Sequence, residues 1–91
     1  MTDRIERMRS RLIATFSPAE CQLADESHLH AGHAGAASGG GHYRLHMVSE
    51  RFEGLNRVTR HRLVYDCLND MMHTEIHALA IIALAPSEVS K

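Results

Sequence analysis

The sequence has no tryptophan, only two cysteines and two prolines, and just 4% aromatic residues. Cys21 and Cys67 lie far apart and form no C-x-x-C pair, which argues against a disulfide framework or a cysteine-rich zinc site and favours a reducing compartment. No apolar run approaches the roughly 20 residues of a membrane helix, and the charged residues 1–7 lack the apolar core of a signal peptide. We therefore expect a small, soluble, cytoplasmic protein.

The sequence also has no clear excess of either sign of charge, because 10 lysines and arginines nearly balance 11 aspartates and glutamates. No global field therefore draws the chain to nucleic acid or to a membrane. What is present is a normal share of apolar residues, 44%, and eight histidines in 91 residues. The length fits one domain spanning residues 1–91, near the lower limit for an independent core.

A first helix is predicted from Asp3, which can cap it with Glu6 at capping-box spacing, to the break at Ser17 and Pro18. Its apolar stripe consists of Ile5, Met8, Leu12, Ile13 and Phe16. We interpret the arginines beside that stripe as a solvated face. A short strand is expected over residues 21–25, and the dense glycine, alanine and serine of residues 25–41 predict a flexible loop.

Strand character resumes over residues 42–49, where Tyr43, Leu45 and Met47 alternate with polar neighbours. After a turn over residues 49–54, Asn56 is a suitable cap for a helix over residues 57–72. At about 100° per residue, the polar side chains at the start of this helix (Arg57, Arg60 and His61) fall on the same side as its predicted buried residues. Arg62 points away from that side. Residues 86–91 are expected to form a frayed tail.

The apolar run over residues 74–84 predicts a buried strand, most simply a parallel strand covered by helix. His77 is out of place near its start, where a branched aliphatic residue would be expected. The predicted order is α-β-β-α-β, with an antiparallel pair followed by a right-handed parallel crossover. Because parallel strands begin at the same sheet edge, we expect His77 to lie near the end of the histidine-containing loop.

These residues resemble the BolA-like proteins. The resemblance rests on Asp25-Glu26-Ser27, on residues 48–55 (VSERFEGL), on residues 60–65 (RHRLVY) and on residues 76–80 (IHALA). It implies a KH-like type II fold of the α/β (α+β) class, with a three-stranded mixed sheet and helices on one face. It also implies partnership with a monothiol glutaredoxin, and a [2Fe-2S] cluster shared with glutaredoxin and glutathione but not held by the isolated protein, expected to be a monomer or weak homodimer.

In this resemblance, His77 matches the C-terminal histidine ligand, and the second ligand lies in the loop between the first two strands. Counting forward from Asp25 selects His30, whereas counting back from His42 favours His33, so both stay open. His28 and His42 rank behind them. We expect His46 and His73 at the surface, and His61 in a structural role. Imidazole can replace thiolate on one iron of such a cluster, leaving it less negative and raising its potential.

A second hypothesis is a KH-like DNA-binding transcriptional regulator that uses Arg57, Arg60 and Arg62 at the start of the second long helix. The balanced charge, the few aromatic residues and the lack of a Gly-x-x-Gly loop weigh against it. An enzyme is not expected, because no nucleophile, base and orienting group stand at fixed spacing and H-E-x-x-H is absent. The first hypothesis, which follows from the resemblance, is that the protein is a non-enzymatic partner of a monothiol glutaredoxin. It would serve cluster trafficking or iron and redox regulation.

Overall fold

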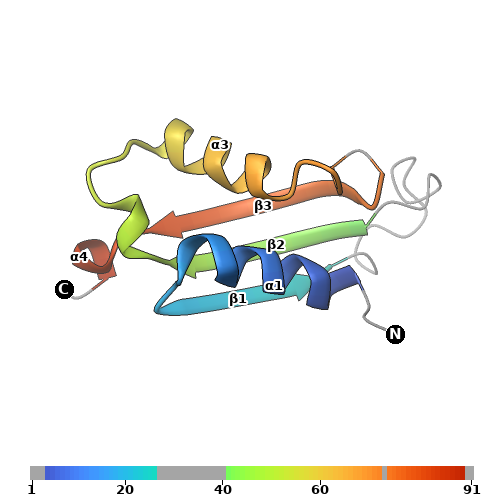
Figure 1. The fold of residues 1–91 in the computed structure, drawn as a ribbon, viewed down its shortest axis with the longest axis horizontal. Coiled ribbons are helices and arrows are strands. Elements are labelled where there is room, and N and C mark those ends of the chain that lie inside the picture. The colour runs from blue at the N-terminus through green and yellow to red at the C-terminus, as the bar shows by residue number, and fades with distance from the viewer. Residues whose placement is uncertain (1–3, 27–40, 73, 90–91) are drawn as a thin grey trace.

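The computed structural model describes residues 4–26, 41–72 and 74–89 (Figure 1). Its elements, in chain order, are α1 (Arg4–Phe16), β1 (Glu20–Asp25), β2 (Gly41–Val48), the 3₁₀ helix η2 (Glu50–Phe52), α3 (Arg57–Cys67), β3 (Ile76–Leu84) and α4 (Pro86–Val89). The strands form one sheet in the order β1-β2-β3, with β1 antiparallel and β3 parallel to β2. The predicted α-β-β-α-β order and mixed sheet are confirmed. No helix in the described ranges is long and apolar enough to cross a membrane.

One face of the sheet packs against α1 and α3. The core combines alternate residues of the strands with one line of residues from each helix, including Met8, Leu12, Phe16, Leu23, Tyr43, Leu45, Met47, Val64, Leu68 and Leu79. The predicted alternation along β2 is therefore confirmed. Ile13 departs from the predicted stripe: the residue is 47% exposed, because the buried line of α1 advances by four residues and leaves it to one side.

β3 is parallel to β2, as predicted, but it is buried on one face only. Ile76, Leu79 and Ala83 are buried, whereas the side of Ala78 and Ala80 is exposed. The described helices cover a single face, so the continuous apolar run does not mark a strand covered on both sides. Small alanines limit the apolar area that this open face presents to water.

α3 begins at the predicted cap, where Asn56 Oδ1 accepts a hydrogen bond of 2.8 Å from Thr59 N. It ends at Cys67, five residues before the predicted end at residue 72. From Leu68 onward the chain forms turns, and Met71 N donates to Leu68 O at 2.8 Å. Leu68 and Met71 are still buried, so the apolar signal was correct while the helical extension was wrong.

The C-terminal segment is also ordered differently from the prediction. Instead of fraying from residue 86, the chain forms α4, whose Ser87 Oγ donates to Glu53 Oε1 at 2.9 Å. Glu88 pairs with Arg60 of α3. Two side-chain contacts from elsewhere in the fold therefore hold a segment that its own composition does not stabilise.

Candidate metal-ligand site

His77 lies at a β-bulge near the start of β3. Gly41 pairs with Ile76 and His42 pairs with Ala78, so His77 is the extra residue opposite the step between Gly41 and His42. Ile76 is fully buried and Leu79 is nearly so, although strict alternation would put residues three apart on opposite faces. The bulge absorbs this mismatch and leaves His77 exposed instead of packed in the core.

His42 and His77 are neighbours on the two parallel strands. Their ring centroids are 5.1 Å apart and the ring planes are inclined at 50°. His42 alternates along β2 with the buried Tyr43, which places it on the sheet face away from α1 and α3. Two imidazoles therefore meet at one corner of the open face, where β2 and β3 begin.

The segment that carries the loop histidines leaves and re-enters the described structure beside this pair. On one side, Glu26 N donates to His42 O at 2.8 Å, and on the other Gly41 N donates to Glu75 O at 3.0 Å. Both ends of the segment over residues 27–40 are thus anchored within two residues of His42 or His77. The predicted proximity of His77 to the end of this loop is confirmed for the backbone at these two anchors.

His28, His30 and His33 lie outside the described residues, as does His73, so the choice between His30 and His33 stays a prediction. In the described ranges, no group of three or more His, Cys, Asp or Glu side chains could hold a metal ion. Imidazole nitrogen suits iron as well as zinc and copper. The donor set thus fits one side of a shared metal group, with further ligands supplied from elsewhere.

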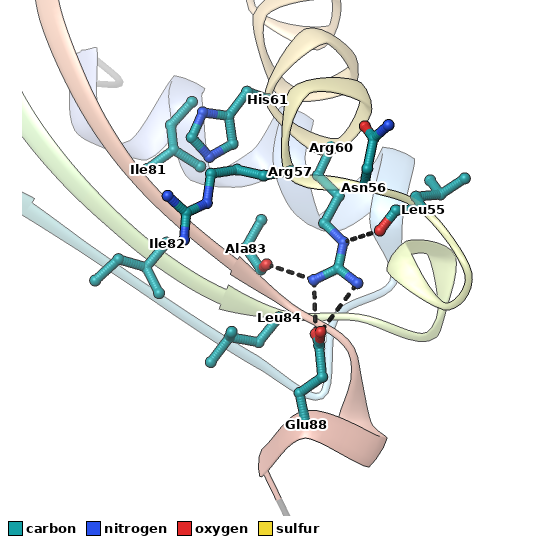
Figure 2. A pocket seen from close by; sticks show the side chains of 10 residues that line it. All are labelled: Leu55, Asn56, Arg57, Arg60, His61, Ile81, Ile82, Ala83, Leu84 and Glu88. Atoms are coloured by element: carbon teal, nitrogen blue, oxygen red, sulfur yellow. Dashed lines mark hydrogen bonds and ion pairs between the residues drawn. The ribbon is translucent and has the colours of Figure 1, made fainter.

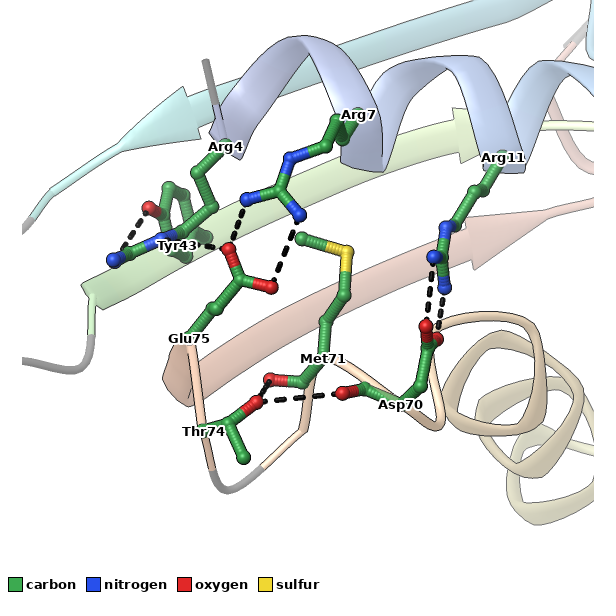
Figure 3. A network of polar contacts seen from close by, with 8 residues as sticks. All are labelled: Arg4, Arg7, Arg11, Tyr43, Asp70, Met71, Thr74 and Glu75. Atoms are coloured by element: carbon green, nitrogen blue, oxygen red, sulfur yellow. Dashed lines mark hydrogen bonds and ion pairs between the residues drawn. The ribbon is translucent and has the colours of Figure 1, made fainter. Parts of the chain in front are cut away.

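Arginines of α1 hold the segment that leads into β3 (Figure 3). Arg7 pairs with Glu75 through both terminal guanidinium nitrogens, and Arg11 pairs in the same way with Asp70. These contacts hold the pKa values of Glu75 and Asp70 below their ordinary range, chiefly because each carboxylate accepts hydrogen bonds from its arginine. The arginines that the sequence predicts on a solvated face are partly exposed, and two of them also form ion pairs with the segment before β3.

The basic cluster at the start of α3 borders a cavity of about 510 Å³ (Figure 2). Arg57 and His61 line the cavity, with Ile82 of β3 among the apolar residues opposite them. Arg62 is exposed and does not belong to the described residues that line this cavity. Of the three arginines predicted to bind nucleic acid, Arg57 and Arg60 therefore line this cavity, whereas Arg62 does not.

Arg60 is 9% exposed and is engaged inside the fold. Its Nε donates to Leu55 O at 2.9 Å, its Nη1 donates to Ala83 O at 2.9 Å, and the guanidinium pairs with Glu88. A guanidinium committed to these acceptors is not available to phosphates. The predicted role of Arg60 in binding DNA is therefore replaced by a structural one.

The remaining candidate residues are placed as follows. His61 is half-buried on the packed side of α3, as expected, although it lines the cavity. His46 is half-buried on the open face of β2, and its Nδ1 is buried without a hydrogen-bond partner among the described residues. Cys67 contacts the Arg11 carbonyl and Thr15 of α1, and burial raises the pKa of the Cys21 thiol.

Sequence reasoning did not name His42 as the ring that lies beside His77. A signal for it was present: His42 begins the second strand and His77 lies near the beginning of the third, and parallel pairing brings such positions together. The bulge that aims His77 away from the core has no comparable signal in the sequence.

Comparisons with known proteins agree with this fold. A family model described as BolA-like protein matches residues 12–88. Protein BOLA1, chloroplastic, of Arabidopsis thaliana is 43% identical over 89 residues, covering 94% of this chain and 56% of that protein. The DNA-binding transcriptional regulator BolA of Escherichia coli (strain K12) is 38% identical over 76 residues, covering 84% of this chain and 70% of that protein. The solved BolA domain of SufE1 from Arabidopsis thaliana has a TM-score of 0.85 at 40% identity, covering 98% of this chain and 99% of that one.

The chain spans 56% of the length of plant BOLA1 and 24% of the plant SufE-like protein 1. The names of these two relatives assign them to the chloroplast or mitochondrion, so the cytoplasmic location expected for this chain stays a prediction. The family match covers most of the chain, and its residues include β2, α3 and β3 with His42 and His77. This chain belongs to the BolA-like protein family.

Proposed function

We propose that this protein binds a monothiol glutaredoxin and co-ligates a bridging [2Fe-2S] cluster through His77 and a second imidazole. The observation that carries the proposal is the position of His77: exposed at a bulge, beside another histidine, and next to both anchors of the loop segment. A histidine kept for packing would be buried and hydrogen-bonded inside the core. This one faces outward at the sheet corner.

The chemistry follows from incomplete coordination. The described residues offer two imidazoles close together and no third donor, so they suit one iron of a cluster whose other ligands are thiolates from glutaredoxin and glutathione. Such a cluster, when bound, supplies a transferable iron–sulfide unit whose potential histidine ligation raises. A partner that holds half of a coordination shell can take part in trafficking or report iron and redox state without catalysing a reaction.

The loop histidines are within chain reach of this corner. His30 lies four residues beyond Glu26, which allows a span of at most about 14 Å, and His33 lies eight residues before Gly41, which allows about 28 Å. Both anchors stand beside His42 or Glu75. Chain length therefore leaves His30 and His33 equally able to serve as the second ligand, as the sequence indicates.

The proposal is tested by mixing the protein with a monothiol glutaredoxin, glutathione and a source of iron and sulfide under anaerobic conditions. We expect a heterodimer whose visible circular dichroism differs from that of the glutaredoxin cluster alone. Spectra that are the simple sum of the separate proteins, with no heterodimer on size-exclusion chromatography, would overturn the proposal.

DNA binding is a second candidate, favoured by the exposure of Arg57 and Arg62 on α3 and by the similarity to the DNA-binding regulator BolA. Removing one side chain that binds a phosphate should reduce the slope of log affinity against log salt by about one. Fluorescence anisotropy with duplex DNA should then show weaker, less salt-dependent binding for Arg57→Ala and Arg62→Ala, and unchanged binding for His77→Ala. An affinity for DNA that is the same in wild type, Arg57→Ala and Arg62→Ala would reject DNA binding through these arginines.

A further inference from the structure

Glu88 of α4 pairs with the guanidinium of Arg60 at the wall of the cavity beside α3 (Figure 2). We propose that this contact is autoinhibitory: Glu88 occupies the position of a DNA phosphate, and its release adds Arg60 to the arginines of α3 that bind phosphates. The inference rests on DNA binding, the second candidate function, and adds a means of regulating it. It gives α4 a role that neither candidate function assigns.

The guanidinium of Arg60 is held in place by contacts that do not involve Glu88. Its Nε donates to Leu55 O and its Nη1 donates to Ala83 O, both at 2.9 Å. The guanidinium carbon also lies 5.9 Å from the centroid of the Phe52 ring. These contacts keep the guanidinium in position when the carboxylate leaves. An arginine that is already positioned loses little conformational freedom when it binds a new acceptor.

The carboxylate of Glu88 is the exposed partner of this pair. Its side chain is 43% exposed, against 10% for the side chain of Arg60. Its two oxygens accept from Nη1 at 2.6 Å and from Nη2 at 3.2 Å. A phosphate group offers a guanidinium the same two-point arrangement of acceptors. Because both residues line the cavity of about 510 Å³, a phosphate that enters the cavity can reach the place of this carboxylate.

α4 is held by polar contacts and not by burial. None of its residues is buried. Ser87 Oγ donates to Glu53 Oε1 at 2.9 Å in an exposed setting, and Glu88 pairs with Arg60. A segment without buried apolar side chains opens at a small cost in free energy compared with global unfolding. Glu88 can therefore leave Arg60 while the core of the fold stays intact.

The charges around the cavity favour the exchange of a carboxylate for a phosphate. Arg57 and His61 also line the cavity, and with Arg60 they lie at positions i, i+3 and i+4 of α3, which share one side of a helix. When Glu88 leaves, the guanidiniums of Arg57 and Arg60 face the cavity without this carboxylate. DNA that binds the open form more tightly shifts the protein toward that form. Glu88 therefore lowers the apparent affinity for DNA.

The test compares Glu88→Gln with Glu50→Gln by fluorescence anisotropy with duplex DNA at 50–200 mM salt. Glu50 is an exposed residue of η2 outside the described lining of the cavity, and both changes remove one negative charge. We expect tighter binding for Glu88→Gln, with a slope of log affinity against log salt that is steeper by about 0.9, as for one further phosphate contact. The change from 50 to 200 mM salt should then cost this variant about 3.5-fold more affinity. Equal affinities and slopes for the two variants would overturn the inference.

The Nε–H signal of Arg60 in ¹⁵N–¹H spectra tests its part directly, without a variant of Arg60 that could fail to fold. DNA should shift this signal in Glu88→Gln at concentrations that leave it unchanged in Glu50→Gln, and the amide signals establish that both variants fold. No shift in Glu88→Gln would overturn the inference. If neither wild type nor any variant binds DNA, the second candidate function fails as well. If wild type binds DNA and Glu88→Gln gains nothing, only the autoinhibitory role fails.

Discussion

Arg60 and Glu88, 28 residues apart in the sequence, form a two-point ion pair that ties α4 to α3. Nη1 lies 2.6 Å from Oε1 and Nη2 lies 3.2 Å from Oε2 (Figure 2). Glu88 Oε1 also accepts from Ala85 N at 2.7 Å, so one carboxylate joins the guanidinium to the start of α4. Arg60 therefore has a structural role, because it connects α3 to the end of β3 and to α4.

Replacing Arg60 should destabilise the fold. Arg60→Ala leaves the carbonyls of Leu55 and Ala83 without this donor and leaves Glu88 without its cation. We expect the free energy of unfolding to fall by about 2–4 kcal/mol, measured by urea denaturation followed by far-ultraviolet circular dichroism.

The control for this prediction is Arg62→Ala on the exposed side of the same helix, which should change the free energy of unfolding by less than about 0.5 kcal/mol. Equal losses of unfolding free energy in the two variants would show that Arg60 has no special structural role. Arg60 would then again be a candidate for binding phosphates.

The pair of Arg11 and Asp70 predicts a dependence of stability on acid. Hydrogen bonding from Arg11 lowers the pKa of Asp70 below its ordinary value of 3.8 in the folded protein. A group whose pKa is lower when folded stabilises the fold above its unfolded pKa, and that stabilisation is lost as the pH falls through the folded pKa. The stability difference between wild type and Asp70→Asn should therefore shrink as the pH is lowered below about 3.8.

Urea unfolding of both proteins at a series of pH values from neutral to strongly acid measures this difference. Glu75 also has a lowered pKa, but it is present in both proteins and cancels in the comparison. A difference that stays constant through this range would contradict a folded pKa set by Arg11.

Gly41 should be hard to replace because Tyr43 covers it. A Cβ at position 41 would lie 2.5 Å from Tyr43 Cε2 and 2.6 Å from its hydroxyl oxygen, which is far closer than atoms pack. We expect Gly41→Ala to cost about 1–3 kcal/mol of unfolding free energy, and less in a Tyr43→Leu background, where the ring is gone.

Gly54 provides the matched comparison. Its φ is +75°, and a Cβ at this position would meet no described atom within 4 Å, so Gly54→Ala should cost about 1 kcal/mol through backbone strain alone. Tyr43→Leu should not relieve that cost. Relief at both glycines, or at neither, would show that the contact with Tyr43 does not explain the requirement for Gly41.

The parts of the fold set by local pattern could be predicted from the sequence. The alternation of Tyr43, Leu45 and Met47 indicated the buried face of β2, and Asn56 marked the start of α3. The parallel crossover brought His77 to the sheet edge where β2 begins. These features depend on period, capping chemistry and connection rules, all of which can be applied to one sequence.

The parts set by tertiary contacts could not be predicted. Arg7 and Arg11 look like ordinary helix-surface residues until Asp70 and Glu75 are placed opposite them. α4 depends on its contact with Arg60, which lies 28 residues away from Glu88. The bulge at His77 arises from packing both Ile76 and Leu79, which no single period describes.

The role of His77 as a metal ligand is the central claim, and one measurement tests it directly. The visible circular dichroism of the reconstituted heterodimer with monothiol glutaredoxin should be compared for wild type, His77→Ala and His46→Ala, with thermal unfolding to establish that each variant folds. We expect His77→Ala to lose the spectrum of the histidine-ligated cluster and His46→Ala to keep it. A folded His77→Ala variant with the wild-type spectrum would contradict this role.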